Sequence, residues 1–127
     1  MKEIHRGDLY SATLEPVVGS EQGGTRPVIV IQNDTGNKHS PTVIVVSVTS
    51  RMRKMRCLPT HTKLHCPKLS ADSISLLEQV RTIDKSRLGD YIGRLDPRDM
   101  RNLEKALLIS VGIQEKTNDH TRPQDRP

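Results

Sequence analysis

Two β-branched stretches, Pro27 to Gln32 (PVIVIQ) and Thr42 to Thr49 (TVIVVSVT), decide the fold of this 127-residue chain. The first is apolar at almost every position, which is typical of a strand covered on both faces. In the second, Ile44, Val46 and Val48 share one face because side chains alternate along a strand. The other face holds Val43, Val45, Ser47 and Thr49. Since the chain has two tyrosines and no phenylalanine or tryptophan, these aliphatic runs must supply the core.

Four weaker strand patterns surround these two runs. They cover Gly7 to Leu14, Leu58 to Leu64, Ser73 to Gln79 and Arg87 to Leu95. The polar segments between them are rich in turn-forming residues, so we expect loops there. These loops are Glu15 to Thr25, Asn33 to Pro41 and the basic run Arg51 to Arg56. For the basic run, contact with an anionic partner and a simple solvated loop both stay open.

Beyond Leu95 the apolar period changes from strand-like to helical. Asp96 is a good N-cap, and Pro97 suits the first helical position. Asp99 adds negative charge to the first turn, where it favours the helix dipole. Apolar residues then recur at steps of three and four, at Met100, Leu103, Leu107 and Val111. With Gly112 as the stop, the pattern predicts a C-terminal helix.

Several short strands followed by one packed helix predict a mainly β fold with a C-terminal helix, built as a small twisted sheet or barrel. A chain of this length forms one domain, which we place at residues 1–114. The segment from Glu115 to Pro127 has no apolar face, so we expect it to be a disordered tail.

The charge balance favours an anionic partner. The formal net charge is +5 and the sequence pI is about 9.5, as in domains that bind nucleic acid, acidic peptides or membrane surfaces. The scarcity of aromatic residues argues against a platform that stacks single-stranded bases. No apolar stretch approaches the roughly 18 residues of a membrane span, and the start of the chain has no signal-peptide pattern. We therefore expect a cytoplasmic protein with no membrane contact.

Four side chains of metal-ligand type fall within one short segment: Cys57, His61, His65 and Cys66. A structural zinc site is the alternative that they raise. Their spacing is not a usual zinc pattern, and Pro59 interrupts it. The two cysteines form no CxxC motif and do not suggest a disulfide framework. We expect no metal and no other cofactor.

The glycine-rich segment from Gly19 to Pro27 (GSEQGGTRP) is the first candidate site, because glycines let backbone approach a ligand closely. Arg26 stands where this loop enters a buried strand, and arginine suits bidentate contact with phosphate. An ordinary arginine beside a mobile surface loop is the alternative. Thr49 ends its strand and has a hydroxyl that can bind a phosphate oxygen, although threonine is also a common strand residue.

Several motifs resemble the MazF/PemK (Kid-like) toxin family. They begin with residues 6–10 (RGDLY) and 16–28 (PVVGSEQGGTRPV), and they continue through 32–34 (QND), 40–42 (SPT) and the strand that ends in Thr49. They resume at 58–61 (LPTH) and 76–85 (LLEQVRTIDK). The resemblance covers roughly residues 5 to 113, with the motifs in order and at family-like spacing.

This resemblance implies an SH3-like barrel of the MazF/Kid/CcdB type with a C-terminal helix, assembled as a homodimer. It implies a sequence-specific, metal-independent endoribonuclease toxin. Such an enzyme cuts single-stranded RNA and leaves a cyclic phosphate and a 5′-hydroxyl. It also implies a MazE-like antitoxin, which we expect to be a small acidic protein whose flexible tail covers the RNA groove.

The resemblance also implies roles for single residues. Arg26 matches the catalytic arginine of the family, and Thr49 matches its catalytic threonine. Further matches lie in the loop that frames the substrate and in a block associated with RNA contact: Ser20, Gln22, Gln79 and Arg81. An arginine with a pKa above roughly 12 is a poor general base, so Glu21 is a candidate base by its chemistry alone.

Two other functions stay open at this stage. One is a non-enzymatic toxin like the CcdB family, which inhibits a topoisomerase by protein contact. The other is an inactive nucleic-acid-binding module. The Arg26 and Thr49 pair favours the ribonuclease.

Overall fold

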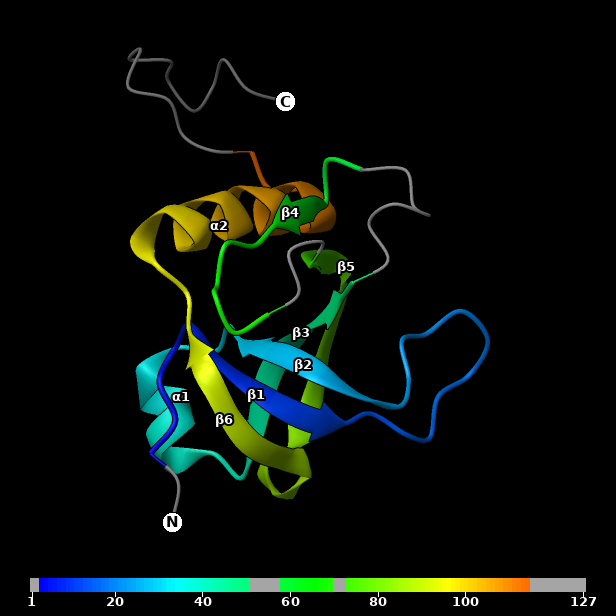
Figure 1. Cartoon of the computed structure of the whole chain (residues 1–127), viewed down its shortest axis with the longest axis vertical. Helices are drawn as coiled ribbons and strands as arrows, with labels where there is room; N and C mark the ends of the chain where they lie inside the picture. The colour runs from blue at the N-terminus through cyan, green and yellow to red at the C-terminus, as the bar shows by residue number, and fades with distance from the viewer. Residues whose placement is uncertain (1–2, 51–57, 70–72, 115–127) are drawn as a thin grey trace, which may run out of the picture.

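The computed structural model describes residues 3–50, 58–69 and 73–114, which form a twisted β-sheet with helices beside it (Figure 1). The strands are β1 (Asp8–Thr13), β2 (Thr25–Val30), β3 (Thr42–Thr49), β4 (His61–Lys63), β5 (Ile74–Asp84) and β6 (Leu88–Arg94). The helical segments are α1 (Asp34–His39), the short 3-10 turn η2 (Lys85–Arg87) and α2 (Pro97–Val111). The basic run 51–56, Cys57 and the segment 115–127 lie outside the described residues.

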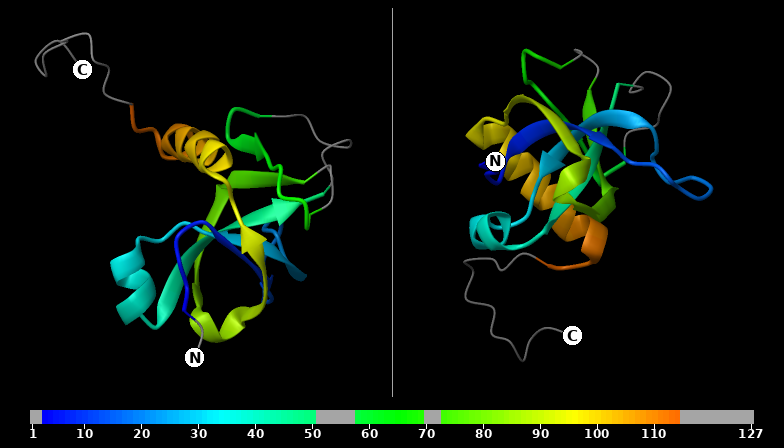
Figure 2. Two further views of the ribbon diagram at one scale, coloured as in Figure 1. Left: turned by 60° about the vertical axis from the view of Figure 1, so that its left-hand side comes forward. Right: turned by 90° about the horizontal axis from the view of Figure 1, so that it is seen from below.

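The sheet has the strand order β4-β5-β3-β2-β1-β6, and each pair of neighbours is antiparallel. Within the described ranges the two edge strands, β4 and β6, are not hydrogen-bonded to each other, so the sheet is open. Figure 2 shows the sheet strongly twisted, with α2 lying outside it. The prediction of a mainly β fold with a C-terminal helix is confirmed, while ladder closure into a full barrel is not seen.

The central strands are buried on both faces, as the continuous apolar run of β2 predicted. Val28 and Val30 belong to one core cluster, which also holds the buried ring of Tyr10. Ile29 belongs to the other cluster, where Leu103 of α2 packs. A sheet with two covered faces needs apolar residues at consecutive positions, and this is why β2 does not alternate.

Helix α2 begins and ends where the sequence predicted. The Asp96 side chain accepts a hydrogen bond of 2.8 Å from the backbone N–H of Asp99. Gly112 closes the helix in the left-handed conformation, with φ of 74°, where a residue with a Cβ is strained. The predicted apolar stripe was wrong at its end, because Val111 is 57% exposed and Ala106 takes part in the buried face instead.

The prediction of a plain loop from Asn33 to Pro41 was wrong, because this segment contains α1. Its N-cap is Asn33, whose side-chain oxygen accepts a 2.8 Å hydrogen bond from the N–H of Gly36. The buried amide of Asn37 donates to the carbonyl of Gln32 at 2.9 Å and so fastens the helix to the end of β2. A six-residue helix has no apolar periodicity to detect, so only its cap signalled it.

Strand β5 is longer than predicted, since it continues past Gln79 to Asp84. Its second half pairs with β3, where Val80 lies opposite Val46 and Asp84 opposite Thr42. This pairing, rather than any local alternation, holds the residues in an extended conformation. As a result Gln79 and Arg81 lie within a strand beside β3. Strand β4, by contrast, is shorter than its predicted range.

Candidate active site

Arg26 and Thr49 are brought together by the register between β2 and β3. Val28 pairs with Ser47 in this antiparallel ladder. Arg26 stands two residues before Val28 and Thr49 two residues after Ser47, so the same antiparallel register places them beside each other at the sheet end. Both line one cavity of about 440 Å³.

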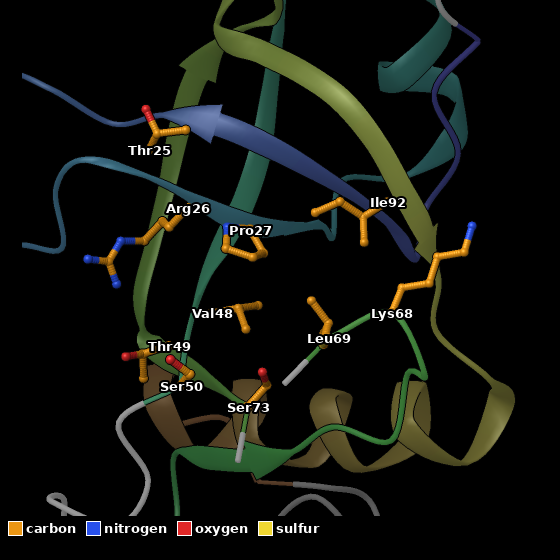
Figure 3. A pocket seen from close by; sticks show the side chains of 10 residues that line it. All are labelled: Thr25, Arg26, Pro27, Val48, Thr49, Ser50, Lys68, Leu69, Ser73 and Ile92. Atoms are coloured by element: carbon orange, nitrogen blue, oxygen red, sulfur yellow. The ribbon is translucent and has the colours of Figure 1, made fainter. Parts of the chain in front are cut away.

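The cavity walls come from distant parts of the chain (Figure 3). The described residues that line it are Thr25, Arg26, Pro27, Val48, Thr49, Ser50, Lys68, Leu69, Ser73 and Ile92. In Figure 3 Arg26 and Thr49 stand on the same side of the hollow, and Lys68 stands on the opposite side. The lining therefore combines apolar side chains with polar groups on two sides, Arg26 and Thr49 on one and Lys68 on the other.

The loop between β1 and β2 is tied down at its base. The carboxylate of Glu15 accepts a 2.7 Å hydrogen bond from the N–H of Gly24, and the Gly24 carbonyl accepts one of 2.9 Å from Leu14. A Cβ added at Gly23 would lie 2.6 Å from a Glu15 oxygen and 2.8 Å from a methyl of Val17. Glycine at position 23 thus lets the loop backbone lie close to the Glu15 and Val17 side chains, which would have to shift for a residue with a Cβ.

Within this loop the guanidinium of Arg26 is held by two acceptors. Its Nε donates a 2.8 Å hydrogen bond to the carbonyl of Gly23. Its Nη1 donates to the side-chain oxygen of Gln22. Two bonds to one planar group fix its orientation, which is the condition for a preorganised electrostatic role.

Gln22 connects Arg26 to strand β5. The Gln22 N–H donates to the side-chain oxygen of Gln79 at 3.3 Å. Its carbonyl accepts a hydrogen bond of 3.4 Å from Nη1 of Arg81. The structure therefore joins four of the site residues named from the sequence in one hydrogen-bonded network: Gln22, Arg26, Gln79 and Arg81.

Beyond Gln22 lies a second hollow, of about 550 Å³, between the loop and β5. Ser20 and Glu21 line it from the loop side, and Gln79 and Arg81 line it from β5. The Glu21 carboxylate accepts a 2.6 Å hydrogen bond from the N–H of Val18. Glu21 is thus placed in the second hollow and is not among the residues that line the cavity of Arg26 and Thr49.

The second hollow also contains a carboxylate that the sequence reasoning missed, Glu78. Its Oε1 accepts a 2.7 Å hydrogen bond from the Thr60 hydroxyl, and its Oε2 is 2.9 Å from Nε2 of His61. Burial raises the pKa of Glu78, but the hydrogen bonds from Thr60 and His61 outweigh it and leave the pKa below its ordinary value. No sequence signal linked these residues, because β4 and β5 meet only in the folded chain.

Among the described residues considered for zinc, the two histidines pair with different carboxylates. His61 is bound to Glu78, whereas Nδ1 of His65 lies 2.7 Å from a carboxylate oxygen of Asp99 in α2. Cys66 is a free thiol, and Cys57 lies outside the described residues. In ranges 3–50, 58–69 and 73–114, no three Cys, His, Asp or Glu side chains gather into a metal-binding group.

Comparison with known proteins matches residues 5–111 to the model of the PemK-like, MazF-like toxins of type II toxin–antitoxin systems. The chain belongs to this family. The predicted family membership is thereby confirmed. The match spans the sheet, both hollows and all of α2, so the site lies within the family domain.

A relative of known activity is close in sequence. The chain is 51% identical over 112 residues to "Endoribonuclease MazF" of Staphylococcus saprophyticus subsp. saprophyticus. That alignment covers 87% of this chain and 92% of the relative. The two proteins are therefore similar over essentially their whole family domain.

Solved structures of other proteins have a similar fold. MazF from Deinococcus radiodurans is similar with a TM-score of 0.78 and 22% identity, over 89% of this chain and 100% of that one. An endoribonuclease from a mycobacterial species, solved in complex with its cognate antitoxin, has a TM-score of 0.75 and 24% identity. That match covers 89% of this chain and 99% of the other. At these identities the likeness shows the fold.

Among the described residues, none of the helices has the length and apolar character needed to cross a bilayer.

Proposed function

We propose that the protein is the toxin of a toxin–antitoxin pair and a sequence-specific endoribonuclease that cuts single-stranded RNA without a metal ion. The observation that carries this proposal is the placing of Arg26 and Thr49 on one cavity wall. The similarity to an endoribonuclease at 51% identity supports it. RNA cutting takes place where cellular RNA is, so we propose a cytoplasmic location.

The proposed reaction is attack by the 2′-hydroxyl of the RNA on the adjacent phosphorus. A bond forms between the 2′-oxygen and phosphorus, and the bond from phosphorus to the 5′-oxygen breaks. The products are a 2′,3′-cyclic phosphate and a free 5′-hydroxyl. One proton leaves the 2′-hydroxyl for a base, and one is delivered to the departing 5′-oxygen.

Arg26 is suited to stabilise the negative charge that grows on the phosphorane oxygens. Its guanidinium is oriented before substrate arrives by Gly23 and Gln22, so little reorganisation is needed. Thr49 offers a hydroxyl to position a phosphate oxygen beside it. Glu21 stays our candidate for the base, and in that role its carboxylate has to leave the N–H of Val18 and turn toward the cavity.

The partners follow from the same proposal. We propose that Gln79 and Arg81, which line the second hollow, contact RNA next to the cut, together with Ser20 and Gln22. We propose a MazE-like antitoxin as the protein partner, supported by the mycobacterial endoribonuclease that was solved with its cognate antitoxin. A homodimer is proposed as the working assembly.

The test is cleavage of a long RNA in the presence of EDTA by purified protein. We expect Arg26→Ala and Thr49→Ala each to abolish cleavage while circular dichroism shows an intact fold. Arg101→Ala is the matched control, because Arg101 is an exposed arginine on α2 and lines neither hollow. Undiminished cleavage by either site variant would remove that residue from the mechanism, and loss of wild-type cleavage in EDTA would contradict metal independence.

A further inference from the structure

The second hollow has the charges of a base-binding pocket and not of a phosphate site. Two carboxylates, Glu21 and Glu78, line it together with Arg81 and the amide of Gln79. Two carboxylates repel a phosphate, whereas a nucleobase has N–H groups that can donate hydrogen bonds to carboxylates. Since Gln22 joins this hollow to Arg26, a base held here lies beside the phosphate in the first cavity.

Glu78 is the most firmly positioned acceptor in this hollow. The Thr60 hydroxyl holds one carboxylate oxygen at 2.7 Å, and the His61 ring holds the other at 2.9 Å. The Glu78 side chain is still 36% exposed, so each oxygen keeps a lone pair for a ligand. A fixed carboxylate with an open side is a ready acceptor that loses little freedom on binding.

His61 acts on Glu78 from a buried position, since its side chain is only 2% exposed. Its Nδ1 accepts a 3.2 Å hydrogen bond from the backbone N–H of Leu58. Because Nδ1 is the acceptor, Nε2 carries the hydrogen and donates it to Glu78. The Leu58 backbone thus selects the tautomer that lets His61 orient the carboxylate.

We propose that Glu78, positioned by His61 and Thr60, determines specificity by accepting a hydrogen bond from the exocyclic amino group of a nucleobase beside the cleaved phosphate. The inference rests on the proposed ribonuclease function and adds to it the chemical class of base that the site reads. The amino groups meant are those at C4 of cytosine and C6 of adenine, where uracil and hypoxanthine carry a carbonyl oxygen; guanine has its amino group at C2 and a carbonyl at C6. A carboxylate repels that oxygen, so the pocket selects against the keto bases.

The experiment uses single-stranded RNA oligonucleotides built on a cut site that the wild-type protein selects in a long RNA. Each amino base flanking the cut is replaced in turn by its keto counterpart, cytosine by uracil and adenine by hypoxanthine. At one flanking position we expect the keto base to slow wild-type cleavage by roughly tenfold. Glu78→Gln should cut both oligonucleotides at similar rates, because an amide hydrogen-bonded to Thr60 and His61 no longer presents a charged acceptor.

Variants of His61 separate positioning from folding. His61→Leu removes the donor to Glu78 and should lose the discrimination, while His61→Gln restores an N–H donor and should recover it. His65→Leu is the matched control, because His65 also pairs with a carboxylate, Asp99, but does not line the hollow. This control should keep the wild-type discrimination, whatever its effect on stability. If His61→Leu does not fold, Glu78→Gln and His61→Gln still decide the question.

The possible negative results distinguish a failure of this inference from a failure of the proposed ribonuclease function. One result overturns this inference and leaves the proposed ribonuclease function intact. In it the wild-type protein cuts RNA, and the Glu78→Gln variant keeps the wild-type sensitivity to amino-to-keto exchange at every flanking position. Wild-type cleavage that is indifferent to every amino-to-keto exchange does the same. Wild-type protein that cuts no RNA overturns the proposed function, and this inference with it.

Discussion

Replacing Gln22 by methionine tests whether this residue positions Arg26. Methionine fills a similar volume and lacks the side-chain oxygen that accepts a hydrogen bond from Nη1 of Arg26. The hydrogen bonds from the Gln22 backbone to Gln79 and from Arg81 to the Gln22 carbonyl do not involve this side chain, so the loop stays attached to β5. The substitution therefore removes one contact and leaves the frame in place.

The expected loss follows from the kind of contact removed. A hydrogen bond to a charged group contributes about 1.5–3 kcal/mol net. Arg26 and Gln22 are half-buried, which favours the lower part of this range, and the 2.8 Å bond from Nε to Gly23 still constrains the guanidinium. About 1.4 kcal/mol of transition-state stabilisation corresponds to tenfold in rate. We expect kcat to fall by about tenfold.

The assay is steady-state cleavage of a fluorescent single-stranded RNA in EDTA. An effect on Arg26 orientation in the transition state lowers kcat, whereas loss of the proposed contact between the Gln22 side chain and bound RNA raises KM. A wild-type kcat in Gln22→Met, or a defect confined to KM, would refute the positioning role. Thermal melting should show little change, because the lost bond lies in a half-buried loop.

Two predictions concern stability. The Ser47 side chain is fully buried, and its hydroxyl has no hydrogen-bond partner among the described residues. Ser47→Ala should therefore raise the free energy of unfolding, measured by urea denaturation, by about 1 kcal/mol. Ser75→Ala is its control and should not stabilise, since the buried Ser75 hydroxyl donates to the Thr62 carbonyl at 3.4 Å; equal gains would contradict the argument. Glu78 has a pKa below the ordinary 4.5, so the ionised form stabilises the fold above that pH, and this stability is lost as pH falls through the lowered pKa. Stability measured from pH 7 to pH 2.5 should therefore decline less steeply in Glu78→Gln than in the wild type, and parallel curves would exclude the linkage.

The elements with strong local signals were predicted well. The continuous apolar run of β2 indicated a strand covered on both faces, and the two core clusters on its two sides confirm it. The N-cap at Asp96 and the stop at Gly112 located α2 closely. Both signals are local, because strand burial and helix capping depend on residues within a few positions of each other.

Elements that depend on distant partners were predicted poorly. α1 is too short to show a period, and a contact that holds it in place comes from a distant residue, Lys85, whose ammonium donates to the Asn37 carbonyl. The second half of β5 has no strand pattern of its own and is extended because β3 lies beside it. In each case the stabilising hydrogen bonds cross between segments, so the local sequence holds only one half of the interaction.

The same division applies to the site. The sequence by itself marked Arg26 as a phosphate ligand at a loop–strand junction, and similarity to a family added Thr49 to it. Only the tertiary structure decided that the two share a cavity, because the register of β2 with β3 is a property of the sheet. Only the pairing of β4 with β5 placed His61 against Glu78. A chain determines its strands and caps through neighbouring residues, whereas a binding site is made by side chains that become neighbours when the sheet forms.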